Sequence, residues 1–329
     1  MKKRLLFFIL VVTILVSAII LLTIKSKKEE TNTTKITVGE VTHSVFYTPF
    51  YVALENGYFN DNGLNIKLVL TSGADKVSAA VLSGDVQVGL AGAESAIYVY
   101  DKGEKDYIQI FSGLTKRDGQ FILSRNNEKE FSLNDLIGKE IIVGRQSGMP
   151  ALNFLNALKK SGINPDDINI NYSIDFAALS GSFIGGIGDY VNLFEPNALK
   201  LEQEGYGYVV ESIGKLSGDM PYTTFYARKS YIKNNDNAIN AFVKAINKGL
   251  EFTKNNDSTT IAKVILPQFP DTSLNDLAKI IDRYKENDAW LETTYISEEL
   301  LQNLEDIMID NKLLDKYVSY KDLVKNYEG

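Results

Sequence analysis

The chain has 329 residues, of which 44% are hydrophobic and 23% are charged, so its composition is that of a globular protein rather than of a disordered, collagen-like or multi-span membrane protein. It contains no Cys and a single His, His43. These counts exclude disulfides, zinc–thiolate centres, iron–sulfur clusters, cysteine nucleophiles and His-clustered metal sites.

The N-terminal part, residues 1–30, is expected to be a membrane segment followed by the start of a tether. Residues 5–24 carry no charge, and a helix of that length is about 30 Å long, which matches the bilayer core. This run is longer than the apolar region of a secretory signal, roughly 7–15 residues, and no clear cleavage site follows it. We therefore expect an uncleaved single anchor in the cell membrane, with a cleaved long signal as the alternative. Residues 25–34 are polar and predict a tether.

The basic residues lie on both sides of the expected span, so they orient it weakly. We place the globular part outside the cytoplasm because the segment is N-terminal and signal-like. After residue 30 the chain carries 29 basic and 40 acidic residues, a net charge of −11. An acidic body of this kind predicts no nucleic-acid partner, and anionic lipid would repel it.

Strand and helix patterns alternate along the folded part, which predicts βαβ units and mostly parallel sheets. Strands are expected at residues 36–41, 66–70, 86–90, 108–114, 121–124, 140–144, 168–172, 190–194, 208–212 and 223–227. Helices are expected at residues 49–56, 74–82, 95–101, 132–136, 150–161, 176–184, 196–203, 236–252, 258–265, 273–286 and 297–309. The order of these elements favours an α/β protein with two lobes.

We expect lobe one to comprise residues 31–120 and 228–329, and lobe two to comprise residues 121–227. A chain that leaves one lobe and returns to it crosses the boundary twice, so the two linkers would form a double hinge. Ligands of parallel α/β sheets bind beyond the carboxyl ends of the strands. The expected ligand site is therefore the central cleft between the lobes.

Four stretches carry a family resemblance. They are residues 47–59 (YTPFYVALENGYF), 80–89 (AVLSGDVQVG), 138–144 (GKEIIVG) and 188–196 (GDYVNLFEP). In this order they resemble the solute-binding proteins of the nitrate/sulfonate/taurine and thiamine-pyrimidine transporter group, which have the type 2 periplasmic-binding fold. The resemblance runs from about residue 36 to about residue 250. Lipid-anchored members of that group carry a Cys, which this chain lacks, and a transmembrane anchor would replace it.

The resemblance implies an extracytoplasmic substrate-binding subunit of an ABC importer. Its partners would be a small-molecule solute, a permease and an ATPase on a separate chain, since this sequence has no Walker A motif. Ligand would close the lobes by shifting a population of open and closed forms.

The candidate ligand-binding residues follow the expected strands or begin the expected helices. They are His43, Phe46, Tyr47, Glu94, Ser95, Ser147, Gly148, Asp175, Phe176, Glu195, Tyr222 and Thr223. Tyr47 could stack on a flat ligand, the helix start at Ser147 and Gly148 could offer free N–H groups, and Glu195 could pair with a protonated nitrogen. The alternatives are a plain loop histidine at position 43, helix caps at positions 94–95 and 147–148, and a loop acid that caps a helix at position 195.

This set is rich in aromatic and carboxylate side chains, which favours a nitrogen heterocycle such as a thiamine pyrimidine precursor. An aliphatic sulfonate, taurine or nitrate is the alternative, because Arg145 could bind an anion. Two other classes remain open, a membrane-tethered sensor and an enzyme of the thiamine-pyrimidine synthase type. That enzyme's Cys-rich motif is absent, and so is the G-x-S-x-G motif. We therefore expect no enzyme, no catalytic residue, no metal and no cofactor.

Overall fold

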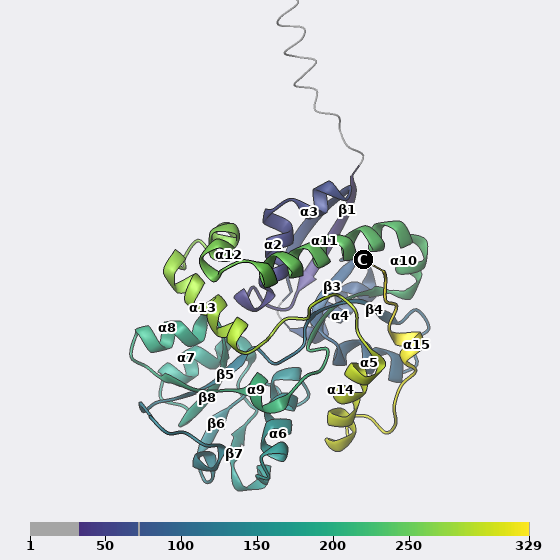
Figure 1. The fold of residues 1–329 in the computed structure, drawn as a ribbon. Helices are drawn as coiled ribbons and strands as arrows, with labels where there is room; N and C mark the ends of the chain where they lie inside the picture. Colours follow the sequence, from purple (N-terminus) through teal and green to yellow (C-terminus); the bar gives the residue numbers. More distant parts are fainter. Residues whose placement is uncertain (1–32, 72, 329) are drawn as a thin grey trace, which may run out of the picture. The chain divides into compact units, whose positions relative to one another are not determined.

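The computed structural model describes residues 33–71 and 73–328 (Figure 1). The expected membrane segment at residues 5–24 lies outside the described residues, and so does the expected tether apart from its last two positions. Within the described ranges, none of the helices combines the length and the apolar character that a membrane span needs.

The described chain contains two five-stranded sheets. The first has the order β2-β1-β3-β10-β4, and the second has the order β7-β6-β8-β5-β9. The strands of the first sheet are β1 (Thr34–Glu40), β2 (Leu64–Leu70), β3 (Val88–Gly92), β4 (Ile108–Thr115) and β10 (Thr223–Arg228). Those of the second are β5 (Gln120–Ser124), β6 (Glu140–Ile142), β7 (Asn169–Asn171), β8 (Tyr190–Phe194) and β9 (Tyr208–Ser212).

Each sheet combines parallel pairs with one antiparallel strand. In the first sheet β1 and β3 are parallel, with Val38 opposite Val88, and β10 runs antiparallel between β3 and β4. In the second sheet β6 is parallel to β7 and β8, whereas β5 runs antiparallel to β8 and β9. The strand expected at residues 223–227 is therefore β10, which lies inside the first sheet rather than in the second.

Helices cover both sheets, and we call each sheet with its helices a lobe (Figure 1). The first lobe includes η1 (Val45–Tyr47), α2 (Thr48–Glu55), α3 (Tyr58–Asp61), α4 (Ala74–Ser83), α5 (Glu94–Asp101), α10 (Lys229–Asn234) and α11 (Asp236–Asn255). The second lobe includes η2 (Leu133–Leu136), α6 (Met149–Lys160), η3 (Pro165–Asp167), η4 (Phe176–Ala178), α7 (Leu179–Ile184), α8 (Asn197–Gln203) and α9 (Ile213–Ser217). The remaining C-terminal elements are α12 (Ser258–Ile265), η5 (Leu266–Gln268), α13 (Leu274–Glu286), α14 (Glu298–Asp310) and α15 (Tyr320–Leu323).

The long helix α11 packs closely on α2 because Gly249 has no side chain. A Cβ atom at this position would lie 2.1 Å from the carbonyl oxygen of Pro49, which is closer than any real contact. Pro49 is itself in the first turn of α2, where a missing N–H has no cost. The apolar side of α11, which includes the fully buried Phe242 and Ile246, then covers the first sheet.

The chain passes between the sheets twice, at residues 116–119 and at residues 218–222. These two crossing segments lie side by side, because the N–H of Met220 donates to the Lys116 carbonyl (2.8 Å) and the N–H of Tyr222 donates to the Thr115 carbonyl (3.1 Å). The segment after α13 braces them, since the N–H of Lys116 donates to the carbonyl of Ala289 (2.9 Å).

Candidate functional site

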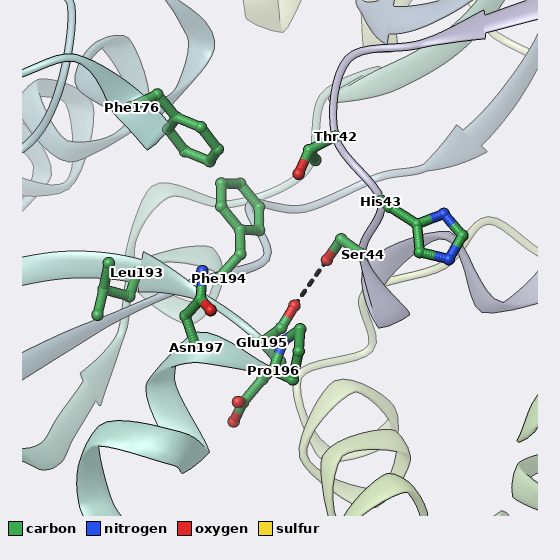
Figure 2. A pocket seen from close by; sticks show the side chains of 9 residues that line it. All are labelled: Thr42, His43, Ser44, Phe176, Leu193, Phe194, Glu195, Pro196 and Asn197. Carbon is green, nitrogen blue, oxygen red and sulfur yellow. Dashed lines mark hydrogen bonds between the residues drawn. The ribbon is translucent and has the colours of Figure 1, made fainter. Parts of the chain in front are cut away.

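A small cavity lies where the two lobes meet (Figure 2). Its volume is about 130 Å³. The first lobe contributes the loop after β1, and the second contributes η4, the end of β8 and the start of α8. The lining residues are Thr42, His43, Ser44, Phe176, Leu193, Phe194, Glu195, Pro196 and Asn197. The hydroxyl of Ser44 donates to the Glu195 carbonyl (2.8 Å), so the lobes are in direct contact at this wall.

His43 lies at the cavity, but its ring is turned away from Phe194 and Glu195 (Figure 2). Nδ1 lies 2.8 Å from Oε1 of Glu40, and Nε2 lies 2.8 Å from the carbonyl of Gln268. Both nitrogens thus face acceptors, and this arrangement favours the doubly protonated ring, the imidazolium. The hydrogen bond to Glu40 raises the pKa of His43 in agreement with this assignment.

The carboxylate of Glu195 points away from the cavity that its carbonyl lines (Figure 2). It is 1% exposed, and it accepts hydrogen bonds from Nη1 of Arg283 (2.6 Å) and from the N–H of Leu199 (2.8 Å). Burial raises the pKa of Glu195, while the Arg283 guanidinium acts to lower it. The carboxylate is therefore already paired, and the residue contributes backbone rather than charge to the cavity wall.

Aromatic side chains from both lobes pack together behind the cavity. The ring of Phe46 lies 5.8 Å from that of Tyr47, 5.4 Å from that of Phe194 and 5.6 Å from that of Tyr222. Phe46, Tyr47 and Tyr222 are all buried. Phe46 also fits against Gly119 of the first crossing segment, where a Cβ atom would lie 2.5 Å from the ring. The predicted aromatic residues are thus brought together at the junction of the lobes.

Glu94 is a buried acid at the start of α5, where β3 ends in the first lobe. Its Oε2 atom has no hydrogen-bond partner among the described residues. A Cβ atom on Gly92 would lie 1.9 Å from Oε2 and 2.6 Å from Cγ of Met149, so the carboxyl group lies over a glycine and beside the second lobe. Burial raises the pKa of Glu94 to about 7, although three backbone N–H groups and Arg145 act to lower it. The neighbouring Ser95 is also buried.

The N-terminus of α6 faces the first lobe across this junction. The hydroxyl of Tyr98 donates to the Ser147 carbonyl (3.2 Å), and the N-cap residue, Gly148, is buried. Arg145 lies just before them, and its guanidinium is half-exposed and pairs with Asp75 at 3.2 Å. The first turn of α6 therefore contributes to the contact between the lobes.

The crossing segments add two buried polar groups, one on each segment. Tyr222 is 4% exposed, and its hydroxyl lies near the carboxyl group of Asp118, whose pKa it acts to lower. Oδ1 of Asp118 accepts from the N–H of Gln120 (2.7 Å), whereas neither Oδ2 nor the Tyr222 hydroxyl has a hydrogen-bond partner in the described part of the chain. Burial raises the pKa of Asp118 well above its ordinary value. Thr223 follows, with its N–H bonded to Oγ1 of Thr115 (3.0 Å).

Asp118 is not among the ligand-binding residues predicted from the sequence. Its neighbours, Lys116 and Arg117, are charged, so the turn has the composition of a solvated loop. In the structure Asp118 is fully buried, while Lys116 and Arg117 pair with Asp288 and Asp219. The one signal for the burial of Asp118 in the sequence is its position between two expected strands.

Asp175 and Phe176 are both exposed, but only Phe176 lines the cavity. Phe176 lines the cavity, and its ring lies 5.7 Å from that of Phe194. Asp175 is exposed, and its carbonyl accepts from the N–H of Ala178 (2.8 Å). Of the predicted residues, His43, Phe176 and Glu195 line the cavity, while the Asp175 side chain lies at the surface. In the described ranges, no group of three His, Asp or Glu residues is arranged to hold a metal ion.

Comparison with known proteins gives the family. The family model described as "NMT1/THI5 like" matches residues 45–259. The Bacillus subtilis (strain 168) protein "Putative binding protein YtlA" is 37% identical over 297 residues, which cover 90% of this chain and 89% of that protein. The chain belongs to the NMT1/THI5-like family. The family resemblance inferred from the four sequence stretches is thereby confirmed.

Solved structures show the fold of this family member. The alkanesulfonate-binding protein SsuA from Xanthomonas axonopodis pv. citri has a TM-score of 0.71 at 16% identity, covering 89% of this chain and 98% of its own. The periplasmic aliphatic sulphonate binding protein SsuA from Escherichia coli has a TM-score of 0.68 at 17% identity, covering 88% and 96%. The NMT1/THI5-like chain therefore has the two-lobe α/β fold of periplasmic solute-binding proteins, as expected from its sequence.

Proposed function

We propose that this chain is the extracytoplasmic substrate-binding subunit of an ABC importer, which captures a small organic solute between its lobes and delivers it to a permease. The observation that carries the proposal is the set of buried polar atoms at the junction, namely Oε2 of Glu94, Oδ2 of Asp118 and the hydroxyl of Tyr222, for which the described residues provide no partner. Each such group costs about 1–3 kcal/mol of stability. Folded proteins retain few of them, and a binding site is a reason to retain them.

The family and the fold neighbours support the same role. The relative from Bacillus subtilis is named as a binding protein, and both fold neighbours are named as sulfonate-binding proteins. These names all describe capture of a solute rather than its chemical conversion. They support a non-enzymatic role for this chain.

Lobe closure would take place about the crossing segments, residues 116–119 and 218–222. The lobes touch through the aromatic contact of Phe46 with Phe194 and through a few direct polar contacts, such as Ser44 with Glu195 and Tyr98 with Ser147. We infer that these contacts form in the closed arrangement and separate when the lobes open. A solute that bonds to both lobes stabilises only the closed form. A shift from 1:99 to 99:1 requires about 5.5 kcal/mol of differential affinity, which a few hydrogen bonds to buried groups can supply.

The anchor expected at residues 5–24 would hold the globular part at the outer face of the cell membrane, next to the permease. The net charge of −11 after residue 30 would keep this part away from anionic lipid. The ATPase would be a separate chain. Extraction of membranes at alkaline pH tests the anchor, because an uncleaved span stays in the pellet whereas a cleaved chain is released.

For the solute we favour a nitrogen heterocycle, such as a thiamine pyrimidine precursor. The aromatic rings of Phe46, Tyr47 and Tyr222 suit a flat molecule, and the carboxyl groups of Glu94 and Asp118 suit its nitrogens. The fold likeness to two proteins named for sulfonates favours an aliphatic sulfonate as the second candidate.

The test is a thermal-shift screen of the full chain in mild detergent, followed by calorimetry on the hits. The panel contains pyrimidines, thiamine, riboflavin, taurine, alkanesulfonates and nitrate. We expect a heterocycle to raise the melting temperature and to reduce the radius of gyration in solution scattering. Stabilisation by sulfonates alone would leave the binding role in place and replace the heterocycle by a sulfonate, whereas no response to any solute would refute the role itself.

A further inference from the structure

The acidic residues near the junction differ in what surrounds their carboxylates. Glu195 is paired with Arg283 and capped by the N–H of Leu199. Asp175 is exposed to solvent. Glu94 is 2% exposed, and its Oε2 atom has no partner within the part of the chain that the structure describes. Of these three acids, Glu94 is therefore the one that is buried and keeps a carboxyl oxygen without a partner among the described residues, although three backbone N–H groups and Arg145 act on its charge.

The position of Glu94 connects it to both lobes. Its carboxyl group lies over Gly92, at a distance that excludes any side chain at position 92, and beside Met149 at the start of α6. A solute that reaches Oε2 would thus contact the first lobe at α5 and lie against the second lobe at α6.

A second buried group faces the same place from the crossing segment. Thr223 lies opposite Gly92 in the pairing of β10 with β3, so Tyr222 precedes the residue that faces the glycine beneath the Glu94 carboxyl group. Tyr222 is 4% exposed, and its hydroxyl also lacks a partner among the residues described. The cluster therefore offers Oε2 of Glu94 and the hydroxyl of Tyr222, which is buried beside the carboxyl group of Asp118.

The charged side chains around Glu94 indicate which charge a bound solute should carry. Arg145 is the cation that acts on Glu94, but its guanidinium is 54% exposed and is paired with Asp75. An anionic solute placed against ionised Glu94 would bring like charges together in a medium of low dielectric constant. A solute with a positively charged nitrogen would instead complete the hydrogen bonding of Oε2 with a charge-assisted bond.

We propose that Glu94 determines the specificity of the cleft and that it selects solutes which present a positively charged nitrogen, such as an amine, an amidine or a protonated ring nitrogen. This inference rests on the proposed function, since it concerns the solute of that same cleft. Tyr222 bonds a second polar atom of the solute. The charge of the solute, rather than its ring alone, then decides whether it is captured.

The experiment uses matched triplets of probes, in which one scaffold carries an aminomethyl, a hydroxymethyl or a sulfonate group. The scaffolds are ethane, benzene and pyrimidine, and binding to the full chain in mild detergent is measured by calorimetry at pH 8. We expect the amine to bind more tightly than the alcohol of the same scaffold, and the sulfonate to bind least. Glu94→Gln should weaken binding of the amine about 100-fold, and it should remove the preference for the amine over the alcohol.

The matched control is Asp101→Asn, which removes one negative charge from the other end of the same helix. This variant should leave the preference for the amine over the alcohol unchanged, because the charge of Asp101 is at the surface and is screened. Far-UV circular dichroism verifies that both variants are folded. If the amine binds Glu94→Gln as tightly as it binds the native chain, or if the sulfonate binds best, the inference fails while the binding role stands. If no probe of any triplet binds but the wider panel gives a hit, the inference fails alone; if neither gives a hit, the binding role fails as well.

Discussion

The guanidinium of Arg283 and the carboxylate of Glu195 form a buried ion pair, with Nη1 and Oε1 2.6 Å apart, between α13 and the end of β8. The same guanidinium also pairs with Glu202 of α8. The next residue, Tyr284, accepts a hydrogen bond from the N–H of Glu195 (3.1 Å) and donates one to the Gly119 carbonyl (3.2 Å). Helix α13 thereby fixes the second lobe close to the point where the chain crosses between the sheets.

Arg283→Met should destabilise the protein by about 3–5 kcal/mol, because it leaves the fully buried Glu195 without a compensating charge. Urea unfolding followed by the fluorescence of Trp290, the single Trp of the chain, measures this loss. Lys254→Met is the control, since Lys254 and Glu292 form an exposed pair that should contribute less than about 1 kcal/mol. Equal losses in the two variants would contradict the assignment of Arg283 to a buried pair.

The order of the elements could be predicted from the sequence because the signals that define each element are local. Helix α2 illustrates this, since Pro49 is near its start and Gly57 follows its end with a φ of 74°. The short helices α3, α9, α10 and α15 were not predicted, because four to six residues are too few to show a helical period. The position of β10 in the first sheet was not predicted either, since pairing between strands depends on residues that are distant in the sequence.

The candidate site was predictable in its location but not in the orientation of its side chains. The sequence predicts Glu195 at a strand end, where the structure has it, with a carboxylate that would bind a ligand. Arg283, 88 residues later, pairs with that carboxylate instead. No local pattern reveals such a partner. For the same reason, the sequence did not distinguish Glu94, whose Oε2 has no partner among the described residues, from the other acids.

Glu94→Gln should make the ligand-free protein more stable at pH 8, by up to about 3 kcal/mol. Burial raises the pKa of Glu94 from 4.5 to about 7. The folded state therefore binds the proton more tightly than the unfolded state does, and the stability that the protonated acid provides is complete below pH 4.5 and is lost as the pH rises through 7. Glutamine keeps the size of the side chain and does not ionise.

The measurement is the urea unfolding free energy of both proteins between pH 4.5 and pH 8. The advantage of Glu94→Gln should grow across this range, while Asp101→Asn should track the native chain throughout. A constant difference between Glu94→Gln and the native protein would show that the carboxyl group does not titrate in this window.

His43→Gln should destabilise the protein more at pH 6 than at pH 9. The hydrogen bond to Glu40 raises the pKa of His43, so the stability that the imidazolium provides is present below about pH 6.5 and is lost as the pH rises through the folded-state pKa. Since the side chain is 32% exposed, we expect a difference of only about 1 kcal/mol. Melting temperatures of both proteins across this pH range provide the check, and the variant contains no other imidazole that could obscure the result. A destabilisation that is independent of pH would mean that the ring is neutral in the folded protein.

Tyr222→Phe separates binding from stability. The hydroxyl of Tyr222 is buried and lacks a partner within residues 33–71 and 73–328, so its removal leaves no group newly unpaired. The stability of the ligand-free protein should therefore stay the same or increase slightly. Tyr226→Phe is the matched control, because the Tyr226 hydroxyl lies 3.2 Å from Oγ of Ser78, and its loss should cost about 1 kcal/mol.

The affinity for the solute should change in Tyr222→Phe and not in Tyr226→Phe, which is the reverse of the pattern expected for stability. Tyr222→Phe removes a group that would bond to the solute, so calorimetry with the best amine probe should show binding weakened about 10-fold. Tyr226→Phe should bind that probe as the native chain does, because its hydroxyl is already engaged within the first lobe. Tighter or unchanged binding by Tyr222→Phe would remove this hydroxyl from the site. A clear loss of stability in the same variant would instead show that the hydroxyl has a partner in the folded protein.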